Sequence, residues 1–357
     1  MTFLYIIAAV LLFGILITVH EAGHFMAARW MKIPVREFAI GFGPKLLKWK
    51  SRKYETEFYL RAIPLGGYCA FYGEDDTTGE FKDDPRSFNR FSVGKRLLTI
   101  IMGPLMNLAL AIVVAVVMYA LTGVPVADGD MITLVRSVNK GSVAEHAGLL
   151  PNDMLLSVDG QKVVDGNLPE LFAQDTTGKE RSLQIIRMVD GKETEITIPI
   201  TPLFDPVEQR NMIGIGMSIA QPLKYVKGSF GDIINNALEL SYRAGTMVIN
   251  AVVNLVTRGE GAGEVAGVVG ITKMIVDEIQ QTQLQGYLYL MVVISINLGL
   301  MNLLIIPGLD GSRIVFLLIE AVRGKPIKKE AYVHTAGMLL LFALMIFITF
   351  RDIIRLF

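Results

Sequence analysis

The motif His20-Glu21-Ala22-Gly23-His24 lies within an apolar segment that extends from Phe3 to Ala28 and is long enough to cross a lipid bilayer. Histidines four positions apart share one face of a helix, so both imidazoles can reach one metal ion, with Glu21 beside them as a candidate general base. Charged and metal-binding groups cost about 2.5 to 3.5 kcal/mol for each charge in hydrocarbon, and they are kept there for function. The segment therefore predicts a metal site inside a membrane.

The composition indicates a chain that is only partly membrane-embedded. Of its 357 residues 52% are apolar and 19% are charged, which is too apolar for an ordinary globular protein and too charged for one that lies wholly in lipid. The net charge is zero and no basic tail is present, so we expect no nucleic-acid partner. The single cysteine, Cys69, excludes an internal disulfide, and we expect it to be a small buried or loop residue.

Four apolar stretches reach the length of a membrane-spanning helix, and the fold class they predict is a multi-pass α-helical membrane protein. The expected transmembrane helices cover residues 1–29, 97–122, 286–311 and 332–350. The first stretch lacks the basic start and the cleavage site of a signal peptide, so we expect it to be retained. Four crossings place both termini on one side of the membrane.

Basic residues predict the orientation. Eight Lys or Arg residues lie between Arg29 and Lys53, and four lie between Arg323 and Lys329, whereas none precedes the first span. Because such residues favour the cytoplasmic side, we expect both basic loops in the cytoplasm and both termini outside it. His20 then lies near the inner side of the hydrocarbon core, where a site for hydrolysis is open to cytoplasmic water.

Residues 30–96 are predicted to form a small cytoplasmic β region associated with the membrane. The stretches Glu37–Pro44 and Tyr54–Tyr68 combine strand-forming residues with Gly and Pro breaks. Gly41 and Gly43 would let another backbone approach closely, which suits a substrate that adds to the sheet as an extra strand. Alternatively, both are ordinary turn glycines.

Two segments between the second and third spans are expected outside the cytoplasm. Residues 128–205 contain a short predicted helix that ends at Gly148 and a strand that ends at Asp159-Gly160. This order resembles a PDZ domain, in which a strand pair and a helix form a groove for an extended peptide. Residues 224–282 are amphipathic and are predicted to form helices on the outer membrane surface, or else a second buried pair of crossings.

The third apolar span supplies a candidate third metal ligand. Asp310 follows the break at Pro307, and 24 residues of helix from Gly286 would place it about 36 Å away, at the depth of His20 and His24. Two histidines and one carboxylate, with water at the fourth position, are typical of an open catalytic zinc site. The alternative for Asp310 is a helix cap or a turn residue in a cytoplasmic loop.

Three amides lie within the predicted spans. Asn297 and Asn302 precede Asp310, and they can either hold the backbone of an unwound substrate or be satisfied between helices. Asn107 follows Gly103-Pro104 in the second span, and we interpret it as an interhelical hydrogen-bonding residue of the scaffold.

These motifs together resemble the site-2 protease family of intramembrane zinc metalloproteases, in its bacterial RseP-type branch, with a single PDZ domain. The resemblance rests on HEAGHF, GFG, PLGGY, MGPLMN and NLLIIPGLDG in this order along nearly the whole chain. It implies zinc on His20, His24 and Asp310, with Glu21 activating the water. It further implies that Asn302 and Asn297 position substrate, and that the β region around Gly41 and Gly43 pairs with it.

The resemblance also implies a function and a location. The expected activity is an intramembrane zinc endopeptidase of the bacterial inner (plasma) membrane that cleaves transmembrane segments of membrane proteins already trimmed by another protease. Anti-sigma factor remnants and leftover signal peptides are examples of such substrates in regulated intramembrane proteolysis. The alternative is a non-catalytic membrane adaptor that binds partners through the PDZ-like groove, although an adaptor has no use for Glu21 in lipid.

Overall fold

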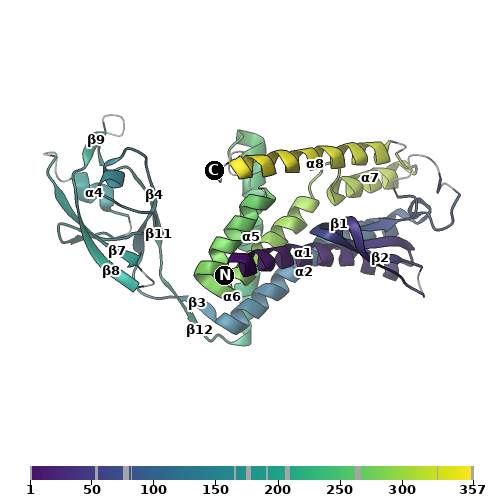
Figure 1. Cartoon of the computed structure of the whole chain (residues 1–357), viewed down its shortest axis with the longest axis horizontal. Helices are drawn as coiled ribbons and strands as arrows, with labels where there is room; N and C mark the ends of the chain where they lie inside the picture. The colour runs from purple at the N-terminus through teal and green to yellow at the C-terminus, as the bar shows by residue number, and fades with distance from the viewer. Residues whose placement is uncertain are drawn as a thin grey trace. The chain divides into compact units, whose positions relative to one another are not determined.

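Two compact units make up the computed structural model, which describes residues 2–52, 55–74, 80–81, 83–164, 166–173, 178–189, 192–205, 210–261, 267–327 and 329–354. The first unit joins Met1–Val124 to Lys227–Phe357, and the second is Pro125–Val226 (Figure 1).

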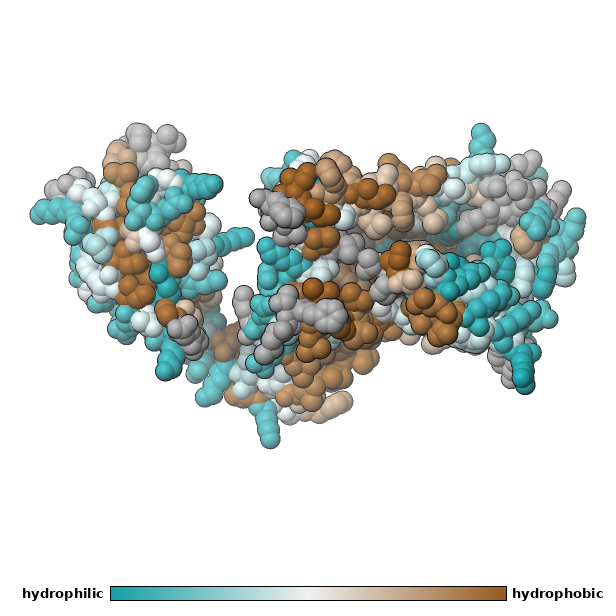
Figure 2. Space-filling model, viewed as in Figure 1, coloured by the Kyte–Doolittle hydropathy of each residue, from teal (hydrophilic) through white to brown (hydrophobic). Residues whose placement is uncertain are grey.

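Long apolar helices form the framework of the first unit. They are α1 (Thr2–Trp30), α2 (Val93–Thr122), α6 (Val268–Asn302) and α8 (Glu330–Ile354). Within the described residues, four segments are long and apolar enough to cross a membrane: Leu4–Trp30, Val93–Thr122, Thr282–Asn302 and Glu330–Ile354. Figure 2 shows hydrophobic side chains over these helices and hydrophilic ones over the neighbouring β sheet. Four long apolar helices are therefore present as predicted, and they fit a membrane protein.

The third span ends earlier than the predicted helix 286–311, so its predicted C-terminal boundary was wrong. Helix α6 ends at Asn302, and Asp310 is instead the first residue of α7 (Asp310–Arg323). Pro307 has no backbone N–H and disfavours a helical conformation at Ile306, and Gly308 has a left-handed φ of +99°. Helix α8 holds this bend, because a Cβ atom on Gly337 would lie only 2.1 Å from the Pro307 carbonyl oxygen.

Residues predicted as amphipathic helices are helical in the structure. Helix α5 (Phe230–Arg258) begins with a capping box between Ser229 and Asp232 and ends at Gly259 in the left-handed conformation. The following helix α6 leaves helical geometry at Gln283, with φ 51° and ψ −127°, which separates its first part from the apolar span. The location of α5 and of the first part of α6 at the membrane surface stays a prediction.

Two long strands between α1 and α2 form the sheet of the first unit. Strand β1 (Val35–Lys50) and strand β2 (Glu57–Phe71) pair with repeated register shifts. Residues 35–40 pair with 67–71, and residues 45–50 pair with 57–61. Val35 and Phe71 are packed in one apolar cluster with Ile100 of α2 and Leu317 of α7. This cluster fixes the end of β2 against the two helices.

The second unit is built on a six-stranded antiparallel sheet. Its strand order is β11-β4-β5-β7-β8, with β6 paired to β5. The strands are β4 (Ile132–Val138), β5 (Met154–Val158), β6 (Gln161–Lys162), β7 (Arg181–Val189), β8 (Lys192–Ile200) and β11 (Ile215–Ala220). Helices α3 (Val143–His146) and α4 (Leu168–Ala173) contribute to the buried core. Two short antiparallel pairs lie outside the main sheet: β9 (Leu203–Asp205) with β10 (Arg210–Met212), and β3 (Val124–Ala127) with β12 (Leu223–Val226).

The predicted boundaries of this domain, 128–205, are too narrow. Strand β11 lies beyond residue 205 and pairs with β4 at the edge of the same sheet. Strand pairing over this separation leaves no signal in local periodicity, which is why the C-terminal strands were missed. The helix before Gly148 and the turn at Asp159-Gly160 are present as expected.

Candidate metal centre

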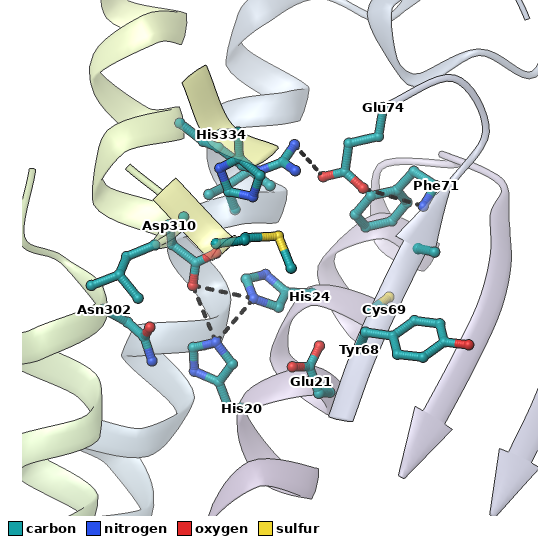
Figure 3. A pocket seen from close by; sticks show the side chains of 16 residues that line it. His20, Glu21, His24, Tyr68, Cys69, Phe71, Glu74, Asn302, Asp310 and His334 are labelled. Carbon is teal, nitrogen blue, oxygen red and sulfur yellow. Dashed lines mark hydrogen bonds and ion pairs between the residues drawn. The ribbon is translucent and has the colours of Figure 1, made fainter. Parts of the chain in front are cut away.

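Three side chains from distant parts of the chain converge in the C-terminal half of α1. His20 and His24 are 7% and 6% exposed on α1, and Asp310 faces them from the first turn of α7 (Figure 3). The carboxylate oxygen Oδ2 of Asp310 lies 3.1 Å from His20 Nε2 and 3.4 Å from His24 Nε2. The two Nε2 atoms are 3.2 Å apart.

The spacing of these three atoms fits one tetrahedral metal ion. Zinc bonds of about 2.0 to 2.1 Å in tetrahedral geometry place neighbouring ligand atoms about 3.3 Å apart. Two imidazoles and one carboxylate leave a fourth position open, as in catalytic zinc sites. The donor set and its spacing therefore suit zinc.

Helix α2 fixes the protonation state of His24. Its Nδ1 lies 3.0 Å from the backbone carbonyl oxygen of Thr99. A carbonyl oxygen only accepts hydrogen bonds, so Nδ1 carries the proton. In the neutral imidazole, Nε2 then presents a lone pair toward Asp310, which is the arrangement that a metal ligand needs.

Asn107 of α2 contacts the Nδ1 atom of His20, as Thr99 contacts that of His24. Its amide nitrogen lies 3.3 Å from His20 Nδ1, while its fully buried Oδ1 accepts no hydrogen bond from the described residues. Rotating the amide by 180° lets Oδ1 accept from a protonated Nδ1, which satisfies both groups. His20 Nε2 then also presents a lone pair to the centre.

The three converging atoms therefore need a cation among them. Asp310 Oδ2, like Asn107 Oδ1, is buried and accepts no hydrogen bond from any residue that the structure describes. A proton can serve only one pair of acceptors, whereas a tetrahedral metal ion can bind all three. This unpaired oxygen, the two oriented rings and their common spacing together favour a metal ion at the centre.

Close approach of α1 and α2 makes this arrangement possible. A Cβ atom on Gly103 would lie 2.3 Å from His24 Nε2, and one on Gly23 would lie 2.4 Å from the backbone oxygen of Met102. Only a residue without a side chain fits at either position. Asn107, interpreted from the sequence as a scaffold residue, contacts His20, and Gly103, to which the sequence reasoning gave no role, packs on His24; their position in the MGPLMN motif was the available signal.

A cavity of about 320 Å³ adjoins the metal centre. Glu21 lines it and lies beside β2, where a Cβ atom on Gly67 would lie 3.2 Å from Glu21 Cγ (Figure 3). The end of β2, from Tyr68 to Phe71, forms one wall, and Asn302 lies beside Asp310 on another. A general base, a strand and the candidate metal ligands thus share one cavity.

The other predicted substrate-binding residues lie away from this cavity. Asn297 is exposed on α6, whereas Asn302 lines the cavity. Gly41 and Gly43 have φ values of +86° and +79° in β1, and a Cβ atom on Gly41 would lie 2.6 Å from the Ile63 backbone oxygen. The sheet itself therefore requires glycine at position 41, and the strand that reaches the cavity is β2.

Comparisons with known proteins agree on one family. The model described as peptidase family M50 matches residues 8–344. The zinc metalloprotease RasP of Oceanobacillus iheyensis is 29% identical, with 99% of this chain and 99% of that protein covered. A protein of Clostridium acetobutylicum is 31% identical over 99% of this chain and 98% of its own, and one of a Nostoc species is 32% identical over 97% and 95%. The names of these last two assign them provisionally to the zinc metalloproteases.

We expect Gly103→Ala to impair zinc binding. The added methyl group would overlap the His24 ring, so the ring must turn away from Asp310. Zinc affinity should fall on the order of 10- to 100-fold, measured by competition with a chelator on protein purified in detergent. Gly94→Ala, in the same helix but with open space around it, is the matched control and should bind zinc as the wild type does.

Asn107→Leu should weaken zinc binding by about 10-fold or more, because Leu has a similar volume but cannot hold His20 Nδ1. Asn107→Asp supplies a carboxylate that accepts from Nδ1–H, and it should restore zinc affinity. Equal zinc affinity in wild type and Asn107→Leu would show that Asn107 does not orient His20.

Proposed function

The chain belongs to peptidase family M50, the site-2 protease family, and is a zinc metalloprotease, and from this premise we propose that it cuts membrane-spanning segments within the bilayer. The observation that carries the proposal is the convergence of His20, His24 and Asp310 beside Glu21 in an apolar helix. Polar and charged groups of this kind are costly in a membrane helix, and they are kept there for function.

We assign the zinc ligands to His20, His24 and Asp310. Zinc held there would polarise the scissile carbonyl and lower the pKa of the attacking water. Glu21, which lies in the same cavity, would accept the proton of that water and deliver it to the leaving amine. Thr99 and Asn107 would keep both imidazoles oriented through the cycle.

The end of β2 is the element that suits an unwound substrate. Residues Gly67–Phe71 pair with β1 along one side, and Tyr68–Phe71 face the cavity. A transmembrane helix hides its carbonyls in its own hydrogen bonds, so it must unwind before hydrolysis, and an extended partner replaces those bonds. Asn302 can contact the substrate backbone in the cavity, whereas a role for Asn297 requires substrate to lie along the exposed surface of α6.

We further propose that the cavity opens toward the cytoplasm of a bacterial cell and that the second unit and both termini lie outside it. The basic residues between Arg29 and Lys53 and those between Arg323 and Lys329 support this orientation. The second unit resembles a PDZ domain and contains a groove of about 90 Å³ between α4 and β11, lined by Phe172, Ile213 and Met217. It would act as a filter that admits membrane proteins already trimmed by another protease, such as anti-sigma factor remnants or leftover signal peptides.

Glu21→Gln separates catalysis from metal binding and from the alternative of a non-catalytic adaptor. Gln has nearly the same shape as Glu but cannot accept the water proton. Hydrolysis of a transmembrane peptide in detergent should fall about 10²- to 10⁴-fold, while the zinc content stays at the wild-type level. Unchanged turnover would remove Glu21 from the mechanism, and a wild-type protein without turnover would favour the adaptor.

The filter is tested by deleting Pro125–Val226, the whole second unit, and joining Val124 to Lys227 through a flexible linker. Cleavage of a substrate that retains its outer domain should rise relative to cleavage of the same substrate after trimming. The measurement is the ratio of the two rates in the same membranes. A ratio that does not change with the deletion would show that the second unit does not select substrates.

A further inference from the structure

A second group of polar side chains lies on the cavity wall next to the metal centre. Arg313 is on α7 one turn after Asp310, and its side chain is 11% exposed. Its Nη1 donates to Glu74 Oε1 at 2.8 Å, and its Nε donates to His334 Nε2 at 3.2 Å (Figure 3). All three residues line the cavity, and none of them has a role in the chemistry described above.

Glu74 connects this group to the strand. It lies three residues beyond the end of β2, and its second oxygen, Oε2, accepts a hydrogen bond of 3.4 Å from the backbone N–H of Phe71. One carboxylate therefore joins the last residue of β2 to Arg313. Because Arg313 and Asp310 share a face of α7, this contact sets the strand against the helix that carries the third candidate metal ligand.

The same strand is held at a second point by the helix that carries the other two candidate ligands. A Cβ atom on Gly67 of β2 would lie 3.2 Å from Glu21 Cγ on α1. Thus the end of β2 packs against α1 at Glu21 and is joined to α7 through Glu74. A substrate paired with this strand takes its position along the strand from these two contacts.

The position matters because strand pairing permits discrete alternatives. A paired peptide that slips by two residues keeps the same faces of its side chains but moves by about 6.6 Å, which carries a different peptide bond to the metal. A buried ion pair such as Glu74–Arg313 contributes little net stability, because desolvation offsets its attraction. Its effect on geometry is the stronger reason to expect a function for it.

We propose that Arg313 is a positioning residue that determines which peptide bond is cut, by fixing the end of β2 against α7 through Glu74. The proposal rests on the proposed function, in that the substrate must pair with β2. His334 holds the other side of the guanidinium from the first turns of α8, so the last membrane helix contributes to the same arrangement.

The test measures cleavage positions by mass spectrometry of the products of a transmembrane peptide. Glu74→Gln and Arg313→Lys each weaken the contact between β2 and α7 while keeping similar side-chain volume. Both variants should retain bound zinc and should yield new products cut two residues away from the wild-type bond. The wild type should yield one dominant cut.

A matched control comes from the other buried ion pair of α7. Arg96 of α2 donates to Glu320 Oε1 at 2.5 Å, so this pair joins α7 to α2 and not to β2. Glu320→Gln should lower the melting temperature without changing the cleavage position. Should Glu320→Gln produce the same shifted cuts, loosening of α7 in general would explain them and the proposal would be wrong.

Failure of this inference is distinguishable from failure of the proposed function. Zinc-loaded Glu74→Gln and Arg313→Lys that cut only the wild-type bond would overturn the positioning role while leaving the protease intact. A zinc-loaded wild type that cuts no transmembrane peptide would overturn both. Two variants are used so that a folding defect in one leaves the other to decide.

Discussion

The convergence of three electron-pair donors on one point is the constraint on which the rest of the first unit depends. Two nitrogen atoms and one oxygen lie 3.1 to 3.4 Å from one another among buried residues. Without a cation they would repel one another, so the surrounding helices must hold them in place. Helix α2 does so through Thr99 and Asn107, and this requires the close packing that Gly23 and Gly103 permit. The second span is therefore as much a part of the metal centre as the HExxH helix.

The break between α6 and α7 serves the same constraint. Helix α6 ends at Asn302, and the turn at Pro307 and Gly308 starts a new helix with the Asp310 carboxylate in its first turn, facing the histidines. The N-terminus of a helix favours a negative charge, which suits a carboxylate at this position. Gly337 lets α8 pack directly on this turn. The last membrane helix thus supports the position of the third ligand without contributing a ligand itself.

Local patterns predicted what depends on neighbouring residues, and the depth of Asp310 in its span predicted its approach to His20 and His24, whereas other contacts between distant segments were missed. The length of the apolar stretches identified the membrane spans, and helical periodicity identified the shared face of His20 and His24. It also explains why Asn297 and Asn302 separate, because five residues correspond to about 140° around a helix, and only Asn302 reaches the cavity. The roles of Asn107 and Gly103 depend on α2 meeting α1, and β11 joins its sheet through pairing with β4, so neither could be derived from local sequence.

Intramembrane hydrolysis has two requirements that hydrocarbon does not meet, namely water and an unwound peptide, and one wall of the cavity is suited to both. The end of β2 offers backbone hydrogen-bonding groups to an extended chain. Two side chains that contact it, Glu21 and Glu74, are carboxylates, and Glu74 brings Arg313 and His334 to the same wall. Groups of this polarity favour water in the cavity, because a dry cavity would leave them poorly solvated. The polar contacts of β2 therefore suit both requirements, and they act beside the apolar cluster of Phe71 and Leu317, which packs the same end of the strand against α7.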